Sequence, residues 1–258
     1  MDFALNSREK RIEYLQMVKG TREALIPSAF SIIDIITYLY NKNLILENPN
    51  EPDILISKGH AASVLYPFIA EKEQVDINYS SDGSSYGIYA NVEIPHIHMP
   101  SGSLGHGLGV AIGLALTRQD IYNHKKIFVV LGDGECFEGS IWEALMYISN
   151  SKINSIIPII DYNDRTILGD ISKTYPNYNL AEKLSGFGFK VFDFDGHDFD
   201  QIADNVSNCL ETKTPSCILA RTVKGKGISF MEESHLWHNR MPDEELFNEA
   251  LGKLKHNL

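Results

Sequence analysis

The sequence has few of the features that mark secreted, membrane-bound or disulfide-rich proteins. It contains 3 cysteines in 258 residues. Their number and spacing suit neither a disulfide framework nor a metal site, so we expect a reducing compartment. No apolar run reaches the roughly 18 residues that a membrane span needs, and the charged segment 1–19 lacks the apolar core of a signal peptide. We therefore expect a soluble, cytoplasmic protein.

The chain also lacks an excess of basic residues. It has 23 Lys and Arg against 34 Asp and Glu, a formal net charge of −11. Nucleic acids and anionic membranes bind basic patches, so we expect neither as a partner. A phosphate-bearing ligand remains compatible with this charge, because a bound divalent cation supplies local positive charge. Repeats, low-complexity tracts and linkers are also missing, so one domain spanning residues 1–258 is the simplest organisation.

Helical and strand patterns alternate along the chain. This alternation predicts an α/β fold with a doubly wound, mainly parallel sheet and helices on both faces. Apolar spacing predicts helices at about 7–19, 31–40, 60–73, 104–118, 140–149, 180–187 and 200–211, and strands at about 53–56, 126–131, 156–160, 190–194 and 216–221. We expect residues 79–102 to be irregular, and also a stretch from Thr222 onward, around Gly225 and Gly227.

The most informative motif is Gly132-Asp133-Gly134-Glu135, which directly follows a predicted strand. Asn163 follows the next strand, so both side chains belong at the edge where open α/β sheets bind ligands. Carboxylate and amide oxygens suit Mg²⁺, whose remaining positions a diphosphate and water can fill. The glycines let backbone N–H groups approach a phosphate. A tight turn alone would also explain them, but the pairing with Asn163 predicts a magnesium–diphosphate site.

Several other motifs allow a plain structural interpretation when each is taken alone. Gly107 and Gly109 fit close helix packing, and Glu138 and Glu143 fit solvated charges near a helix start. His60 opens a predicted helix, where the dipole disfavours a protonated ring and favours a neutral hydrogen-bond donor to phosphate.

Taken together and in order, the motifs resemble the diphosphate-binding half of transketolase, the thiamine-diphosphate enzyme that moves two-carbon ketol units between sugars. The similar segments are Ser57-Lys58-Gly59-His60, residues 101–107, Gly132-Asp133-Gly134-Glu135, Glu138-Gly139, Trp142-Glu143-Ala144, Asp161-Tyr162-Asn163, residues 222–227 and Trp237-His238. They cover most of the chain. The resemblance implies the thiamine-diphosphate-binding fold, with thiamine diphosphate and Mg²⁺ or Ca²⁺ as cofactors.

The resemblance also implies roles for individual residues. It implies that Asp133, Asn163 and the backbone carbonyl of Arg165 bind the cation. It also implies that His60, Gly134 and His238 contact the diphosphate, and that Glu135 is among the cofactor-binding residues. It places Ile167 and Leu104 near the thiazolium and Gly102 near the aminopyrimidine. Glu138 resembles the acid that links the two cofactor sites across the dimer, and we assign it, with His60 and His238, to the catalytic group.

Two departures from the family pattern carry further expectations. The pyrimidine-binding half, with the glutamate that activates the aminopyrimidine, is absent from this sequence. We therefore expect a partner chain with that domain, no activity without it, and a dimer of heterodimers. The two substrate histidines of the family are also missing: Leu25 stands near the first position and residues 86–91 near the second, with His96 or His98 as alternative replacements. A non-standard sugar or sugar phosphate is the predicted substrate.

Two other functions fit part of the pattern. The alpha-type subunits of 2-oxo-acid dehydrogenases and decarboxylases share the metal motif and also need a partner, but residues 57–60 and 138–144 favour transketolase. The second alternative is a cofactor-binding subunit without catalysis. Intact Asp133 and Asn163 speak against it, since an idle site has no physical need for both.

Overall fold

A parallel sheet of five strands forms the centre of the molecule in the computed structural model, which describes residues 2–117, 125–166, 169–232 and 234–256. The strands are β1 (Ile54–Ile56), β2 (Ile127–Gly132), β3 (Ile156–Tyr162), β6 (Lys190–Asp195) and β7 (Ser216–Arg221), in the spatial order β1-β2-β3-β7-β6. Every neighbouring pair runs parallel. The predicted parallel α/β sheet is confirmed.

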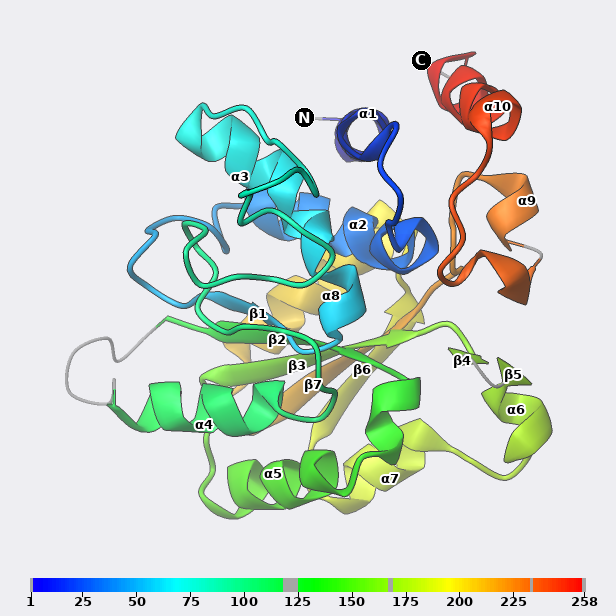
Figure 1. Cartoon of the computed structure of the whole chain (residues 1–258). Helices are drawn as coiled ribbons and strands as arrows, with labels where there is room; N and C mark the ends of the chain where they lie inside the picture. The colour runs from blue at the N-terminus through cyan, green and yellow to red at the C-terminus, as the bar shows by residue number, and fades with distance from the viewer. Residues whose placement is uncertain (1, 118–124, 167–168, 233, 257–258) are drawn as a thin grey trace.

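Helices cover both faces of this sheet (Figure 1). One face carries α1 (Phe3–Val18), α2 (Ile26–Asn41), the 3₁₀ segment η1 (Gly59–Leu65), α3 (Tyr66–Glu73) and α8 (Phe199–Glu211); the other carries α4 (Gly107–Thr117), α5 (Gly139–Asn150) and α7 (Leu180–Gly186). Each layer has its own cluster of buried apolar side chains against the sheet. β2 and β3 are buried almost throughout, because both of their faces are covered.

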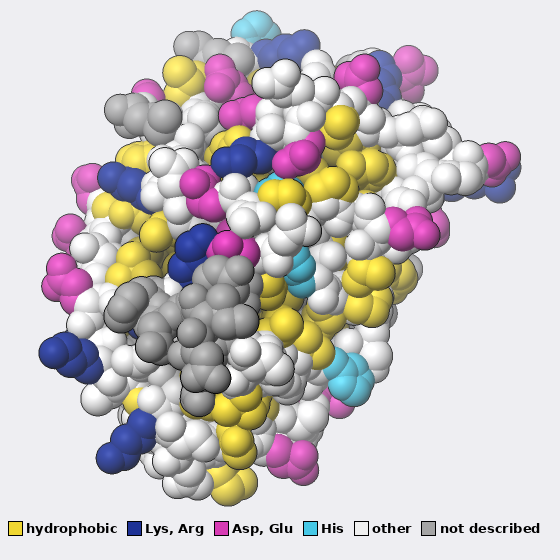
Figure 2. All heavy atoms as spheres, turned by 90° about the vertical axis from the view of Figure 1, so that its left-hand side faces the viewer, with side chains coloured by type: hydrophobic (Ala, Val, Ile, Leu, Met, Phe, Trp, Pro, Cys, Tyr) yellow, Lys and Arg dark blue, Asp and Glu magenta, His cyan; other side chains and the backbone are white. Residues whose placement is uncertain are grey.

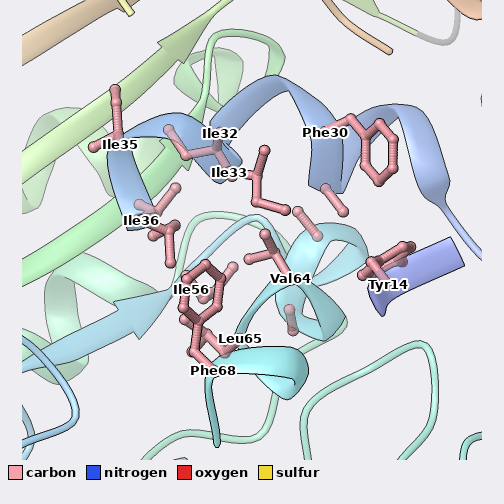
Figure 3. Packing of buried hydrophobic residues seen from close by; sticks show 14 of the residues in the cluster. Tyr14, Phe30, Ile32, Ile33, Ile35, Ile36, Ile56, Val64, Leu65 and Phe68 are labelled. Atoms are coloured by element: carbon pink, nitrogen blue, oxygen red, sulfur yellow. The ribbon is translucent and has the colours of Figure 1, made fainter. Parts of the chain in front are cut away.

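The larger cluster is built around α2, whose residues from Ile26 to Leu39 are all buried. A helix that is apolar on every side must be enclosed by other elements. Figure 3 shows Phe30 and Ile33 of α2 in one cluster with Tyr14 of α1 and Val64 of η1. The Tyr14 and Phe30 rings meet edge to face, 5.7 Å apart. Each such side chain contributes about 1.5–3 kcal/mol by burial, so α1 and α2 are firmly fixed to the sheet.

Two predicted boundaries differ from the structure for identifiable reasons. α2 begins at Ile26, before the predicted start at Ser31, and has a proline in its first turn. Proline is tolerated there because the first helical N–H groups have no partner in the helix. The segment predicted as one helix over 60–73 divides into η1, a 3₁₀ segment, and the α-helix α3.

The expectation of an irregular stretch from Thr222 onward, around Gly225 and Gly227, holds for residues 222–228 and is wrong for much of the chain beyond them. It contains the short elements α9 (Ser229–Glu232) and η3 (His235–Trp237), and then the helix α10 (Glu244–His256). Phe247, Ala250 and Leu254 are the buried residues of α10 and recur at helical spacing. That spacing is the signal in the sequence from which this helix could be predicted. Residues 79–102 are irregular, as predicted.

The remaining short elements lie after β2 and β3. They are η2 (Gly134–Phe137), the hairpin strands β4 (Arg165–Thr166) and β5 (Gly169–Asp170), and α6 (Ile171–Thr174). β2 and β3 are in register with Gly132 opposite Asp161. This register brings Asp133 and Asn163, the next residues to leave the sheet, to neighbouring positions.

Three expectations about composition and surface can be compared with the structure. All three cysteines are buried free thiols. Within the described ranges, no helix combines the length and the apolar character needed to cross a bilayer. Figure 2 shows basic and acidic side chains intermingled on the face that it presents, without a continuous basic patch.

Candidate functional site

A cavity of about 1100 Å³ lies where β2 and β3 end. Such an edge, at the carboxyl ends of parallel strands, is the usual ligand site of open α/β sheets. The sequence-predicted residues that line it are His60, Gly102, Leu104, Asp133, Gly134, Glu135, Glu138, Asn163, Arg165 and His238. The structure therefore brings together residues from segments far apart in the chain. Ile167, the other predicted contact, lies outside the described residues.

Asp133 occupies the floor of the cavity with 2% of its surface exposed. One carboxylate oxygen, Oδ2, accepts the backbone N–H groups of Asn163 at 2.9 Å and Asp164 at 2.6 Å. The other, Oδ1, accepts the N–H of Gly134 at 2.7 Å. Burial, and then the nearby Asp161 carboxylate, raise the pKa of Asp133 to about 7 despite these bonds. A carboxylate in this environment is stabilised by added positive charge.

Asp161 is the second buried carboxylate, and it is neutralised by the protein itself. Its Oδ2 accepts from Lys58 Nζ at 2.5 Å and from Ser31 Oγ at 2.5 Å, while Thr222 Oγ1 donates to Oδ1. Burial acts to raise its pKa, but the Lys58 ammonium and the hydrogen bonds outweigh burial, so the pKa of Asp161 is lowered. Asp161 is a structural charge, whereas Asp133 is left for a ligand.

Asp161 also orients Asn163. The amide nitrogen of Asn163, Nδ2, donates to Asp161 Oδ2 at 3.0 Å, so Oδ1 takes the opposite direction and accepts the N–H of Arg165 at 3.2 Å. A donor and an acceptor on the same amide are thus assigned by their neighbours. Outer contacts of this kind orient metal ligands in proteins. This role of Asp161 does not follow from the sequence alone.

The donor set at this floor fits a hard cation that takes part of its coordination from a ligand. Asp133 has no basic partner among the ion pairs of the described residues. Within the same part of the chain, no group of three or more His, Cys, Asp or Glu side chains is placed to hold a metal. One carboxylate and one amide oxygen leave most positions open, which is the usual situation for Mg²⁺ with phosphate oxygens and water.

A wall of basic and imidazole side chains lines the cavity above this floor. Lys224 Nζ lies 2.9 Å from His238 Nδ1, and the rings of His60 and His238 are 5.8 Å apart between centroids. The pKa of His60 is lowered to about 3, mainly by burial and secondly by the positive charge of Lys58. The pKa of His238 is lowered to about 4, mainly by burial and secondly by the positive charge of Lys224. Both rings are therefore neutral at pH 7. The pKa of Lys224 is lowered to about 8, mainly by burial and secondly by the positive charge of Lys58.

This wall can bind a phosphate group. Neutral imidazoles donate single hydrogen bonds, and a lysine supplies a compact positive charge to phosphate oxygens. Lys58 and Lys224 both belong to motifs of the sequence, but no role follows for either from the sequence alone. Their local signals were the position of Lys58 beside His60 and that of Lys224 in the glycine-rich stretch 222–227.

Glu135 lines the cavity, but its carboxylate is held by the protein. Oε1 accepts from Ser57 Oγ at 2.5 Å and from the N–H of Gly105 at 2.8 Å, and Oε2 accepts from the N–H of Gly132 at 3.2 Å. Burial raises the pKa of Glu135 above its ordinary value. These bonds fasten the turn around Gly105 to the end of β2. A direct contact of Glu135 with a cofactor stays a prediction.

Three glycines near the turn around Gly105 differ in how closely neighbouring atoms pack against them. A Cβ on Gly107 would lie 2.4 Å from Ser57 Cβ, and one on Gly59 would lie 2.5 Å from the nitrogen of Gly102. Gly109 has nothing within 4 Å of its own Cβ position. Close packing therefore explains Gly59 and Gly107 and does not explain Gly109.

Glu138 is exposed at the mouth of the cavity. It occupies the N-cap position of α5, and its side chain makes no capping hydrogen bond there. Two aromatic rings line the same mouth: Phe137 and Tyr175, 4.9 Å apart, with 42% and 52% of their surface exposed. The catalytic assignment of Glu138 stays a prediction.

Residues near the two positions of the family's substrate histidines also line the cavity, and they are of other types. They are Ala24 and Leu25 near the first position and Ile88 and Tyr89 near the second. His96 is buried and bonded to Glu73 at 2.8 Å. His98 lines a separate small cavity. Among the described residues, His60 and His238 are the only histidines that line the main cavity, so neither His96 nor His98 replaces a substrate histidine there.

Comparisons with known proteins identify the family of the chain. The family model described as "Transketolase, thiamine diphosphate binding domain" matches residues 11–248. An apulose-4-phosphate transketolase subunit of Actinobacillus succinogenes is 34% identical over 238 residues, covering 87% of this chain and 85% of that protein. The corresponding apulose-4-phosphate transketolase subunit of Phocaeicola vulgatus is 28% identical over 265 residues, covering 98% and 94%.

Two further similarities extend the range of relatives. The "6-deoxy-6-sulfo-D-fructose transketolase subunit SqwG" of Clostridium sp. is 32% identical over 241 residues, covering 89% of this chain and 88% of that protein. The crystal structure of transketolase from Campylobacter jejuni superposes with a TM-score of 0.88 at 24% identity, covering 99% of this chain and 43% of that one. The chain thus spans less than half of that transketolase, and this likeness concerns the fold alone.

Proposed function

The chain belongs to the transketolase family of thiamine-diphosphate-binding domains, and on that premise we propose that it is the diphosphate-binding subunit of a two-chain transketolase. It transfers a two-carbon ketol unit between sugars together with a partner chain. The observation that carries the proposal is that Asp133 and Asn163 line the same cavity as Lys224, His60 and His238. Oxygen ligands for a cation on the floor and phosphate-binding side chains on the wall are the groups that a metal-bound diphosphate needs.

The residues of this chain bind and orient the cofactor. Asp133, Asn163 and the carbonyl of Arg165 hold Mg²⁺ or Ca²⁺, and His60, His238 and the backbone around Gly134 contact the diphosphate. Lys224 adds a positive charge beside them. Leu104 and Gly102 also line the cavity, and they would contact the organic part of the cofactor. Bound thiamine diphosphate supplies the carbon nucleophile for ketol transfer.

A partner chain completes the site. The apulose-4-phosphate and 6-deoxy-6-sulfo-D-fructose relatives are all named as transketolase subunits, and this chain covers 85–94% of their lengths. We propose that residues 1–258 form one diphosphate-binding domain and that a C-terminal transketolase-like subunit brings the pyrimidine-binding domain. The assembly is a dimer of heterodimers in the cytoplasm, and Glu138 at the cavity mouth contributes to the link between cofactor sites.

The substrate is a sugar or sugar phosphate outside the ordinary transketolase set. Leu25 lies in the cavity where the family pattern has a histidine, and Ile88 and Tyr89 line it as well. An apolar side chain cannot replace the hydrogen bonds of an imidazole to sugar hydroxyls. The relatives are named for apulose 4-phosphate and 6-deoxy-6-sulfo-D-fructose, which are both unusual sugars.

Reconstitution tests the proposal. The chain, its candidate partner and their mixture are assayed with thiamine diphosphate, Mg²⁺ and a panel of ketose donors and aldose acceptors. We expect transfer only by the mixture, with xylulose 5-phosphate and ribose 5-phosphate as poor substrates. Transfer by this chain alone would refute the two-chain assembly, and efficient use of that ordinary pair would refute the altered specificity.

The same preparation tests the two alternatives. An alpha-type dehydrogenase subunit would support pyruvate oxidation with an artificial electron acceptor, which we do not expect from a member of this family. A cofactor-binding subunit without catalysis would bind thiamine diphosphate in the complex but transfer no ketol unit from any donor.

A further inference from the structure

Lys224 reaches the cavity from the Lys224 loop, residues 222–227, which is anchored on both sides of Lys224. The backbone N–H of Val223 donates to His197 Nε2 at 2.8 Å. The carbonyl of Lys226 accepts from Arg11 Nε at 3.1 Å. The two anchoring side chains come from segments far apart in the sequence. A backbone held before and after one residue leaves that residue little freedom to move its Cα.

Both anchors meet on one buried carboxylate, Asp34 of α2. His197 Nδ1 lies 2.6 Å from Asp34 Oδ2, and Arg11 donates to both oxygens, at 2.7 and 2.9 Å. The side chains of Asp34 and His197 are 7% and 9% exposed. Bidentate arginine–carboxylate pairs of this kind fix geometry as well as charge.

The hydrogen bonds assign the tautomer of His197. Its Nε2 accepts the N–H of Val223 and therefore carries no proton, so Nδ1 carries the proton and donates it to Asp34. An imidazole is oriented by the partner of its second nitrogen. Asp34 thus determines which nitrogen of His197 is available to the Lys224 loop.

We propose that Asp34 and His197 are positioning residues that hold Lys224 at the phosphate-binding wall. Neither side chain lines the cavity, so both act through the backbone of the loop. Lys224 Nζ then sits 2.9 Å from His238 Nδ1. The consequence for diphosphate binding rests on the proposed function, whereas the positioning of the loop does not.

Two near-isosteric variants separate the two hydrogen bonds of His197. In His197→Asn the amide nitrogen takes the place of Nδ1 and keeps the bond to Asp34, but nothing reaches Val223. In His197→Gln the amide oxygen takes the place of Nε2 and accepts from Val223. We expect the Val223 amide to exchange hydrogen at least tenfold faster in His197→Asn and near the wild-type rate in His197→Gln.

The Thr222 amide, which donates to Tyr162 O at 3.0 Å, is the reference within the same loop. Its exchange should be similar in all three proteins. Unchanged Val223 exchange in His197→Asn, or equal loss of protection in both variants, overturns the inference. A test without variants is the nitrogen–nitrogen coupling across the bond from Val223 to His197 Nε2 in the wild-type chain, measured by NMR. Its absence also overturns the inference.

The cofactor readout is made on the reconstituted complex. We expect His197→Asn to weaken the affinity for thiamine diphosphate about tenfold while kcat at saturating cofactor stays near wild type, and His197→Gln to restore the affinity. If His197 had a merely structural role, the substitution would lower both the cofactor affinity and kcat, or neither of them. If the wild-type complex bound no thiamine diphosphate, the proposed function would fail while the exchange result on the chain alone would still stand or fall by itself.

Discussion

Lys58 and Asp161 form a buried ion pair, 2.5 Å long, with 2% of each side chain exposed. Asp133, beside Asp161 on the cavity floor, is equally buried and belongs to none of the ion pairs of the described residues. Two neighbouring carboxylates therefore differ in how their charge is balanced. Asp161 is paired with Lys58, whereas Asp133 has no basic partner among these ion pairs, as the proposed cation site requires.

Exchanging each carboxylate for its amide should reveal this difference. Asp161→Asn leaves the Lys58 ammonium buried without its partner, which costs about 3–5 kcal/mol of unfolding free energy. Asp133→Asn loses hydrogen-bond acceptors but also removes an unpaired buried charge, so we expect a change within about 1 kcal/mol. Urea unfolding of the chain measures both. Asp193→Asn, which removes an exposed carboxylate paired with Arg221, is the matched control. Equal destabilisation by the two buried variants would contradict the assignment.

Gly107 and Gly109, on the same helix, should respond oppositely to alanine. At Gly107 the new methyl group would meet Ser57 Cβ at 2.4 Å, which forces the start of α4 away from the residue that follows β1 and costs about 1–3 kcal/mol or more. At Gly109 the methyl group meets nothing within 4 Å, so the better helix propensity of alanine should stabilise the chain by about 0.5–1 kcal/mol. Thermal and urea unfolding provide the comparison. A stabilising Gly107→Ala would show that the turn is not closely packed.

The histidines of the wall should make the chain less stable in acid. Burial lowers the pKa of His60 to about 3 from 6.5, so below pH 6.5 the unfolded chain binds a proton that the folded chain does not. Stability then falls as the pH decreases from 6.5 toward the folded value, by about 2 kcal/mol at pH 5. His60→Gln should lose less stability over this range than the wild type. His106→Gln, at an exposed position, should behave as the wild type does. If stability depended on pH in the same way in all three proteins, the ring of His60 would have to be exposed to solvent.

Lys224 should make cofactor affinity depend on pH in the alkaline range. Its pKa is lowered to about 8 by burial and by Lys58, so the free site loses its positive charge between pH 7 and 9. We expect the complex to bind thiamine diphosphate about tenfold more weakly at pH 9 than at pH 7. Lys224→Arg stays charged and should remove this dependence, whereas Lys224→Met should bind weakly at both pH values. Lys226→Met, in the same loop but outside the cavity wall, is the control. A pH dependence that survives in Lys224→Arg would exclude Lys224 as its source.

Much of the site could be predicted because its motifs lie at strand ends. Asp133 and Asn163 each follow a buried apolar strand, and parallel pairing brings such positions together whatever the intervening sequence. The sheet could be predicted for the same reason, since β2, β3 and β7 are short apolar runs with clear limits.

The remainder depends on contacts between distant segments. Lys58 meets Asp161, and Arg11 meets the carbonyl of Lys226, only because the fold brings them together. No local pattern indicates such a pair. Leu25 is a different case, since an apolar residue in a buried stretch resembles any core residue. Only the family resemblance indicates a place near the substrate for Leu25, and in the structure it lines the cavity.

Calorimetry of the reconstituted complex with thiamine diphosphate, with and without Mg²⁺, tests the central claim most directly. We expect saturable binding that requires Mg²⁺, that is lost in Asp133→Asn and that survives in the control Asp193→Asn. Absence of binding in the presence of Mg²⁺, or binding that is unaffected by Asp133→Asn, would contradict the account.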